Sequence, residues 1–476
     1  MKVLGSLFLL AFFSLSFLSQ LTYAHDNGEG ESKKSTATPT TEEQILFLKQ
    51  RIERLEELID RQQQLIDSLS KNTTAAPATV EPAQPVQPAT VSTPPVSAIK
   101  DDDNQRKLDS LVKNFGSLKL SGDLRIRYDG QYNQGFDAPV GLPERNRLRG
   151  RVRLQLAGEI NKNFDWAIRF GSGSFTTPVS LHQSFTDFFT RKPVGFDRYF
   201  IRYNSNTEPI GVVLQAGKFD YPWKRTELTF DNDLQVEGAA ETVYIKSKGF
   251  FKEGRLTAFQ LPFSEVSVGK DSYLLGGSFT GIVGNTNWLF SGTTTFLNFN
   301  RADALARSLG RPSTQVGGGL ELVSTNRLRR DAAGNVIGFV ANFNLLDVIG
   351  ELTYRPASRF PLTFVGNYVR NMTDRVSNEK NGYWAELRVG RLKEKGDIEL
   401  GYTFIRTEQD AVLSPFNYSV ILGTTNSRAN RVAAGYMINN NVFFQVTSTF
   451  FRRFNVIAGN PNRTQARLQL DMNYKF

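Results

Sequence analysis

Hydrophobic and polar side chains alternate along residues 145–156, which read RNRLRGRVRLQL. Arg147, Arg149, Arg151 and Arg153 share one parity, and apolar residues with one glycine occupy the other. Since successive side chains of a β-strand point to opposite faces, a period of two predicts a strand with one charged face and one apolar face. A soluble sandwich could bury the apolar face of such a strand, so this stretch alone leaves the fold open.

The same alternation recurs along most of the chain beyond residue 113. It predicts sixteen strands, at residues 117–129, 145–156, 164–170, 196–204, 210–218, 240–248, 255–263, 272–283, 286–297, 342–355, 362–371, 382–392, 397–408, 428–438, 441–453 and 465–476. The segment 317–341 could supply one further hairpin, which would give eighteen strands. This part of the chain is therefore predicted to be all-β.

Long and short connections take turns between these predicted strands. The long polar connections are residues 131–144, 172–194, 219–239, 298–341, 409–427 and 454–464, and the short turns read NKN, NSNTE, GNTN, KEKGD and NNN. Transmembrane β-barrels show this rhythm, with long extracellular loops and short periplasmic turns, and a soluble sandwich has no reason to keep it. We therefore expect an antiparallel transmembrane barrel with both of its ends in the periplasm.

The last predicted strand, 465–476, is amphipathic to its end. Its apolar parity includes Tyr474 and finishes on the terminal Phe476. An amphipathic final strand that ends in phenylalanine resembles the assembly signal of bacterial outer-membrane proteins. The resemblance implies insertion into an outer membrane, with lipid around the barrel.

The first 110 residues differ in pattern from the barrel domain at 111–476. Residues 1–24 hold one lysine, an apolar run and a small-residue cleavage site, which predict a secretory signal peptide. A retained anchor is disfavoured because the apolar run is short for a membrane span of about 20 residues. An acidic, structureless leader at 25–40 precedes a coiled coil at 41–71. Residues 72–110 form a proline-rich linker that ends in a short polar helix.

The predicted coiled coil has isoleucine at the first position of four successive heptads. These residues are Ile45, Ile52, Ile59 and Ile66. The run containing Arg51, Ile52, Leu55 and Glu56 also resembles a trimerisation motif of short parallel coiled coils, in which the arginine pairs with the glutamate of a neighbouring chain. We expect a homotrimer with a periplasmic coiled coil, and a dimer or a lone helix are the alternatives.

Charge and composition are compatible with an exported membrane barrel. The sequence has no cysteine and a formal net charge of +10, and residues 113–476 hold 46 Lys and Arg against 32 Asp and Glu. A basic exported domain with low overall hydropathy is compatible with a barrel, because every second residue faces water. Export and the scatter of the arginines over many strands argue against a nucleic-acid partner.

The cost of arginine in lipid decides which face points inward. One arginine at the midplane of the lipid face costs roughly 2–4 kcal/mol, so four on one strand would cost on the order of 10 kcal/mol. We therefore expect the charged face to line a wet lumen, where basic side chains favour anions. Some arginines would instead pair with carboxylates and stiffen the wall. The predicted pore-lining residues are Arg125, Arg127, Arg147, Arg149, Arg151, Arg153, Arg169, Arg198 and Arg202.

The connection at 219–239 is long, aromatic and mixed in charge. Its place after the fifth predicted strand matches the inward-folding constriction loop of porins, and the alternative is that it packs outside or caps the barrel. The charged residues predicted to face one another across the passage are Lys224, Arg225, Asp231, Asp233 and Glu237. The acidic spacing lacks the rest of a calcium-binding loop, so we predict neither a metal nor a cofactor.

Three stretches resemble the bacterial family of putative porins: LKLSGDLRIRY, RKPVGFDRYFIRY and TFDNDLQVEG. Together with the coiled coil and the linker, the resemblance covers nearly all of the mature chain. The loop pattern of the family has Trp where Phe230 stands and Asn-Pro where Gln235 and Val236 stand. The resemblance implies an outer-membrane channel of unspecified substrate and adds no catalytic residues.

These observations favour a trimeric channel for passive diffusion of small hydrophilic solutes, with a preference for anions. The alternative is a structural tether, whose coiled coil binds peptidoglycan or spans the periplasm while the barrel serves as an anchor. Basic residues in the lumen favour the channel, because an anchor gains nothing from them. A hydrolase is disfavoured because His25 and His182 are the only histidines available to assist a nucleophile.

Overall fold

A computed structural model describes residues 118–135, 142–186, 188–265, 269–309, 325–356, 360–421, 424–456, 459 and 461–476. The signal peptide, the leader, the coiled coil with its predicted trimer residues and the proline-rich linker lie outside the described residues. All of the described residues belong to the predicted barrel domain.

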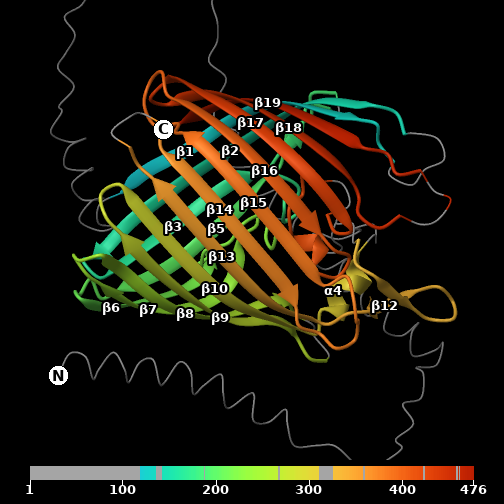
Figure 1. Cartoon of the computed structure of the whole chain (residues 1–476), viewed down its shortest axis with the longest axis horizontal. Helices are drawn as coiled ribbons and strands as arrows, with labels where there is room; N and C mark the ends of the chain where they lie inside the picture. Colours follow the sequence, from blue (N-terminus) through green and yellow to red (C-terminus); the bar gives the residue numbers. More distant parts are fainter. Residues whose placement is uncertain are drawn as a thin grey trace, which may run out of the picture. The chain divides into compact units, whose positions relative to one another are not determined.

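Within the described residues, sixteen antiparallel strands form a closed barrel (Figure 1). Each strand pairs with the next along the chain, and β1 pairs with β19 to close the wall. The prediction of a sixteen-stranded antiparallel barrel is confirmed. The strands are β1 (Lys119–Tyr132), β2 (Arg145–Asn161), β3 (Phe164–Ser172), β5 (Val194–Asn204), β6 (Ile210–Phe219), β7 (Val236–Lys246), β8 (Phe251–Ser264), β9 (Ser272–Gly284), β10 (Trp288–Asn300), β13 (Phe343–Tyr354), β14 (Leu362–Asn371), β15 (Asn381–Gly390), β16 (Ile398–Thr407), β17 (Ser427–Asn439), β18 (Val442–Arg453) and β19 (Gln465–Lys475).

The remaining elements lie within the long connections. The short strand β4 (Gln183–Ser184) pairs with β2, and η1 (Ser414–Phe416) is a single 3₁₀ turn. The helix α4 (Asp303–Ser308) precedes β11 (Leu328–Arg330) and β12 (Val336–Phe339), which form a separate two-stranded sheet. The alternative of eighteen barrel strands is therefore wrong, because this hairpin pairs with itself and not with the wall.

The two ends of the barrel differ in what they carry. The helix α4 and the strand β12 lie at one end, and the C-terminus lies at the other (Figure 1). Within the described part of the chain, no helix is long and apolar enough to cross a membrane.

Alternate residues of the strands have opposite environments, as the two-residue period predicts. On β2 the side chains of Leu148 and Val152 are 53% and 49% exposed. On the opposite parity, Arg151 is 5% exposed and pairs with carboxylates of β1 and of the connection after β6. The apolar parity therefore faces outward, and the arginine parity faces the inside of the barrel.

The interior contains an apolar core in addition to charged residues. Among the described residues, the connections 220–235, 301–342 and 408–426 each contribute several buried apolar side chains to this core, and Val179 and Val376 add one each from two other connections. Trp223 of the first connection stacks on Phe259 of β8, with ring centroids 4.0 Å apart. The sequence predicted one inward connection, but apolar side chains of further connections join the same core, where they pack against one another and against the wall.

Candidate functional site

One side of the interior, formed by β1, β2 and β19, carries a dense cluster of arginines that we call the arginine wall. At its centre Asp129 is fully buried. Its carboxylate accepts hydrogen bonds from Arg147 at 2.5 Å and from Arg467 at 2.7 Å, and Arg149 lies 3.6 Å away. One carboxylate therefore holds three guanidinium groups that come from β2 and β19.

The neighbouring pairs follow from the register of these strands. Asp123 lies directly across from Arg153 on β2, and it pairs with Arg153 at 2.6 Å and with Arg151 at 2.8 Å. Arg127 lies across from Asp471 on β19 and pairs with it at 2.6 Å.

Arg125 has a weaker partner, since its Nε donates to the neutral Oδ1 of Asn473 at 2.6 Å. Counted over the described residues, seven arginines of the arginine wall meet four carboxylates. These residues are Arg125, Arg127, Arg147, Arg149, Arg151, Arg153 and Arg467, with Asp123, Asp129, Asp233 and Asp471. The arginine wall therefore keeps a surplus of positive charge.

The other predicted pore-lining arginines lie further along the wall. Arg169 of β3 pairs with Asp197 at 2.6 Å and is buried. On β5, Arg198 pairs with Asp220 at 3.1 Å, and Arg202 pairs with Asp165 at 3.0 Å. All the predicted arginines therefore lie on the inward parity, and most have a carboxylate partner.

The connection 220–235, which we call the inward loop, crosses the interior of the barrel. Lys224 pairs with Glu351 of β13 at 3.0 Å, and Thr226 donates to Asn367 of β14 at 2.5 Å. Further along the inward loop, Glu227 pairs with Arg431 of β17 at 2.8 Å, and Asp233 pairs with Arg151 of β2 at 3.2 Å. Contacts with strands so widely separated around the wall require the inward loop to lie inside the barrel.

The charges of the inward loop do not form two opposed rows. Arg225 donates to the carbonyl oxygen of Phe230 at 2.8 Å, and its guanidinium lies 4.1 Å from the ring centroid of Tyr221. Asp231 is buried and accepts hydrogen bonds from the backbone N–H groups of Asp233 and Ser419. Burial raises the pKa of the Asp231 carboxyl to about 7, and the carboxylates of Asp233 and Glu227 add to this shift. Arg225 and Asp231 therefore contact neighbouring groups of their own and do not face each other across a passage.

Glu237 lies outside the inward loop. It belongs to β7 and pairs with Lys218 of β6 at 2.7 Å. The predicted bounds of 219–239 were too wide, because Phe219 still pairs with Val236 in the ladder between β6 and β7.

Two inward arginines that the sequence pattern did not single out have central places. Arg467 completes the arginine wall, and Arg431 joins the inward loop to the connection 408–426. The guanidinium of Arg431 lies 4.8 Å from the ring centroid of Trp384 and 5.5 Å from that of Tyr418. Both residues fall on the inward parity of predicted strands, so the two-residue period could have found them.

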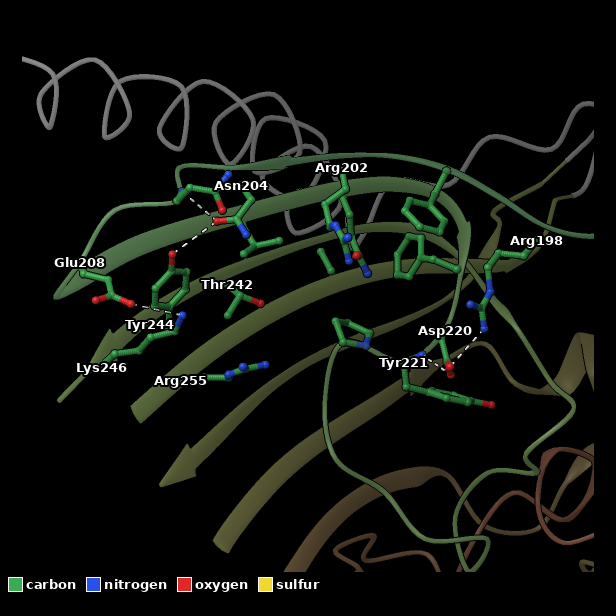
Figure 2. A pocket seen from close by; sticks show the side chains of 17 residues that line it. Arg198, Arg202, Asn204, Glu208, Asp220, Tyr221, Thr242, Tyr244, Lys246 and Arg255 are labelled. Atoms are coloured by element: carbon green, nitrogen blue, oxygen red, sulfur yellow. Dashed lines mark hydrogen bonds and ion pairs between the residues drawn. The ribbon is translucent and has the colours of Figure 1, made fainter. Parts of the chain in front are cut away.

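A cavity of about 530 Å³ lies against the inner side of β5, β6, β7 and β8. Figure 2 shows Arg202 and Arg255 reaching toward its centre from opposite sides, with Thr242 between them. Residues of the inward loop, including Tyr221, form its border. The cavity is therefore separate from the arginine wall, which lies on other strands.

Among the residues that the structure describes, no three His, Asp or Glu side chains are grouped as metal ligands would be. His182 lies 3.8 Å from Asp233 and is buried beside the arginine wall. The groups inside the barrel are thus guanidinium, carboxylate, amide, hydroxyl and aromatic side chains.

Comparison with known proteins gives one family match. The model of the family described as "Putative porin" matches residues 141–302 and 319–476. No curated protein matches the chain.

Several solved structures are similar over most of the chain. OprB of Pseudomonas putida, in its high-pH structure, is 10% identical, with 79% of this chain and 97% of that chain covered and a TM-score of 0.47. OmpF of Salmonella typhi, in a complex with daunomycin, is 10% identical over 76% of this chain and 99% of that chain, with a TM-score of 0.43. An anion-selective porin from Comamonas acidovorans has the same identity, coverage and TM-score as OmpF.

Proposed function

Because the chain belongs to the putative porin family, we propose that it lets small hydrophilic solutes diffuse passively across the outer membrane and that it prefers anions. The observation that supports the preference is the surplus of arginine over carboxylate on the arginine wall. Inside a barrel with low-dielectric walls, such a surplus raises the local concentration of anions and repels cations. The family and the barrel suggest a channel without catalysis.

The proposal extends to the surroundings of the barrel. The outward parity is apolar on strands such as β2, which suits contact with outer-membrane lipid. We propose a homotrimer, held in part by the periplasmic coiled coil at 41–71, with the proline-rich linker between coiled coil and barrel. Tyr474 and Phe476 are proposed as the assembly signal.

The test is a planar-bilayer recording of the full-length protein under a gradient of KCl. We expect ionic conductance and a reversal potential of the sign that chloride permeation produces. A reversal potential of the opposite sign would overturn the anion preference, and absence of any conductance would overturn the channel itself.

Two variants connect the preference to the arginine wall. Arg125 and Arg149 have no carboxylate within hydrogen-bonding distance among the described residues, so Arg125→Gln and Arg149→Gln leave no newly unpaired acid. Each should move the reversal potential toward zero. Arg452→Gln, on the outward parity of β18, is the matched control and should not move it.

A further inference from the structure

The cavity of Figure 2 is hollow because small inward side chains lie between long ones. The register places Arg202 of β5 beside Gln215 of β6, and Gln215 beside Ala240 of β7. One level further, Val213 pairs with Thr242. The side chains of Ala240, Val213 and Thr242 are short, so they leave the space open. Residues 220–222 of the inward loop border this space.

Cationic groups lie at both sides of this hollow. Arg202 is on β5 and Arg255 is on β8, three strand spacings away, and the register places Arg255 four residues along the strands from the level of Arg202. Arg198 and Lys246 add two more positive charges, and the acidic residues of the lining are Glu208 and Asp220. The lining thus holds four cations and two carboxylates, and Asp165 and Glu253, which lie outside the lining, pair with Arg202 and Arg255.

The carboxylate partners of these cations leave donors free for a solute. Arg202 engages Asp165 through Nε, and its side chain remains 43% exposed. Lys246 lies 3.8 Å from Glu208, and Arg255 pairs with Glu253. A guanidinium has five N–H donors, so one ion pair fixes its position without using all of them.

Neutral polar groups and aromatic rings occupy the space between the cations. Asn204, Gln215 and Thr242 present amides and a hydroxyl. The Tyr244 hydroxyl lies 3.4 Å from Oδ1 of Asn204, and the ring packs beside Lys246 at 5.0 Å. Amides and hydroxyls suit the hydroxyl groups of a solute, and a ring face suits its carbon skeleton.

We propose that this cavity is a binding subsite for hydroxylated organic anions, such as sugar phosphates and sugar acids. The cations bind the phosphate or carboxylate group by charge-assisted hydrogen bonds, and the amides and Thr242 bind the hydroxyl groups. The inference deepens the proposed function, since a solute reaches the cavity through the lumen.

The experiment measures binding to the purified full-length protein in detergent micelles by isothermal titration calorimetry. The probes are glucose 6-phosphate, glucuronate, glucose and inorganic phosphate. We expect both organic anions to bind at least about tenfold more tightly than glucose, which lacks the charge, and than inorganic phosphate, which lacks the carbon skeleton. Equal binding of inorganic phosphate or of glucose, or no binding of either organic anion, overturns the proposal.

Variants localise the binding to the cavity. Replacing Arg202 and Arg255 together by Gln should raise the Kd for glucose 6-phosphate about tenfold or more, and replacing both by Lys should restore part of the affinity. Arg452→Gln, on the outward parity of β18, should leave this Kd unchanged. An unchanged Kd in the double Gln variant overturns the site, provided that this variant keeps the heat-modifiable gel mobility of a folded barrel.

Calorimetry separates this inference from the proposed function. Binding in a protein that does not conduct in bilayers supports the subsite and contradicts the channel. Conductance without binding of the organic anions supports the channel and contradicts the subsite.

Discussion

At the scale of single residues, two glycines face each other across β6 and β7. Gly217 pairs with Gly238, and their φ angles are +127° and +136°. A Cβ on Gly238 would lie 2.1 Å from the carbonyl oxygen of Gln260. This pair lets the ladder continue to Phe219 and Val236, directly before the chain turns into the barrel.

Gly238→Ala should therefore destabilise the barrel. The positive φ alone costs about 1–3 kcal/mol for a residue with a side chain, and the close approach to β8 adds to it. The measurement is the temperature at which the folded band is lost in a heat-modifiability gel. Gly249→Ala is the matched control, because its Cβ would meet only the Ser247 Oγ, at 3.7 Å; equal behaviour of the two variants would contradict this explanation.

Asp129 is the second residue whose replacement is informative. It is the shared partner of Arg147 and Arg467, with Arg149 nearby. Asp129→Asn should lower the free energy of unfolding by about 3–5 kcal/mol, because breaking a buried pair leaves an uncompensated charge.

The control for Asp129 is Asp165→Asn, whose partner Arg202 is far more exposed. That replacement should cost about 0–1 kcal/mol. Urea unfolding of both variants in the same detergent tests the difference. Similar losses of unfolding free energy in the two variants would show that water screens the charges of the arginine wall as well as it screens that of Arg202.

At the scale of elements, Arg431 of β17 joins parts that are distant in sequence. It pairs with Glu227 of the inward loop and packs against Trp384 of β15 and Tyr418 of the connection 408–426. The position of the inward loop thus depends on a residue some two hundred positions later in the chain.

Arg431→Gln should loosen the inward loop. The replacement removes ion pairs with Glu227 and Glu386 and two cation–π contacts, together worth about 3 kcal/mol or more in a partly buried site. Single-channel recordings should show higher open-state noise and brief closures. Arg428→Gln on the exposed parity of β17 should leave the noise unchanged, and a quiet Arg431→Gln channel would contradict this role.

The strands were predictable and the interior was not, for a physical reason. A strand has a two-residue period that its stretch of sequence displays locally, so both the number of barrel strands and the inward parity of Arg147 and Arg151 could be derived, although the bounds of strands such as β7 could not. The connections have no period. Their positions rest on distant contacts, such as the hydrogen bond from Ser419 to the carbonyl of Val179, which no local pattern encodes.

Some partners of charged side chains could be predicted from the sequence, and others could not. The pairing of Asp123 with Arg153 follows from adjacent strands in sequence. The pairing of Arg125 with Asn473 follows from the register between β1 and β19, which the sequence alone does not set. The surplus of positive charge could therefore be predicted, but not which arginines would lack an acidic partner.

At the scale of the whole molecule, the terminal residue takes part in closing the barrel. Phe476 and Gly122 exchange two backbone hydrogen bonds, at 2.9 and 3.1 Å. The ring of Phe476 also stacks on Tyr474, with centroids 5.6 Å apart.

Removal of Phe476 should reduce the yield of folded barrel. Two hydrogen bonds at the seam are worth about 2 kcal/mol in total, and the loss acts on the last step of closure. The measurement is the fraction of urea-unfolded protein that refolds into lipid vesicles. Lys475→Gln is the control, since it keeps the terminal residue and the backbone bonds, and equal refolding of the two variants would contradict the role of Phe476.

The closing of β1 against β19 also sets the timing of folding. The hydrogen bond from Arg125 to Asn473 joins residues 348 positions apart, which gives the barrel contacts of very high sequence separation, and such contacts slow folding. The free edge of β1 has no permanent partner until β19 is available to pair with it. An unpaired edge of this length is a template for aggregation, so folding without aggregation requires that the chain be kept apart from its copies until β19 pairs with β1.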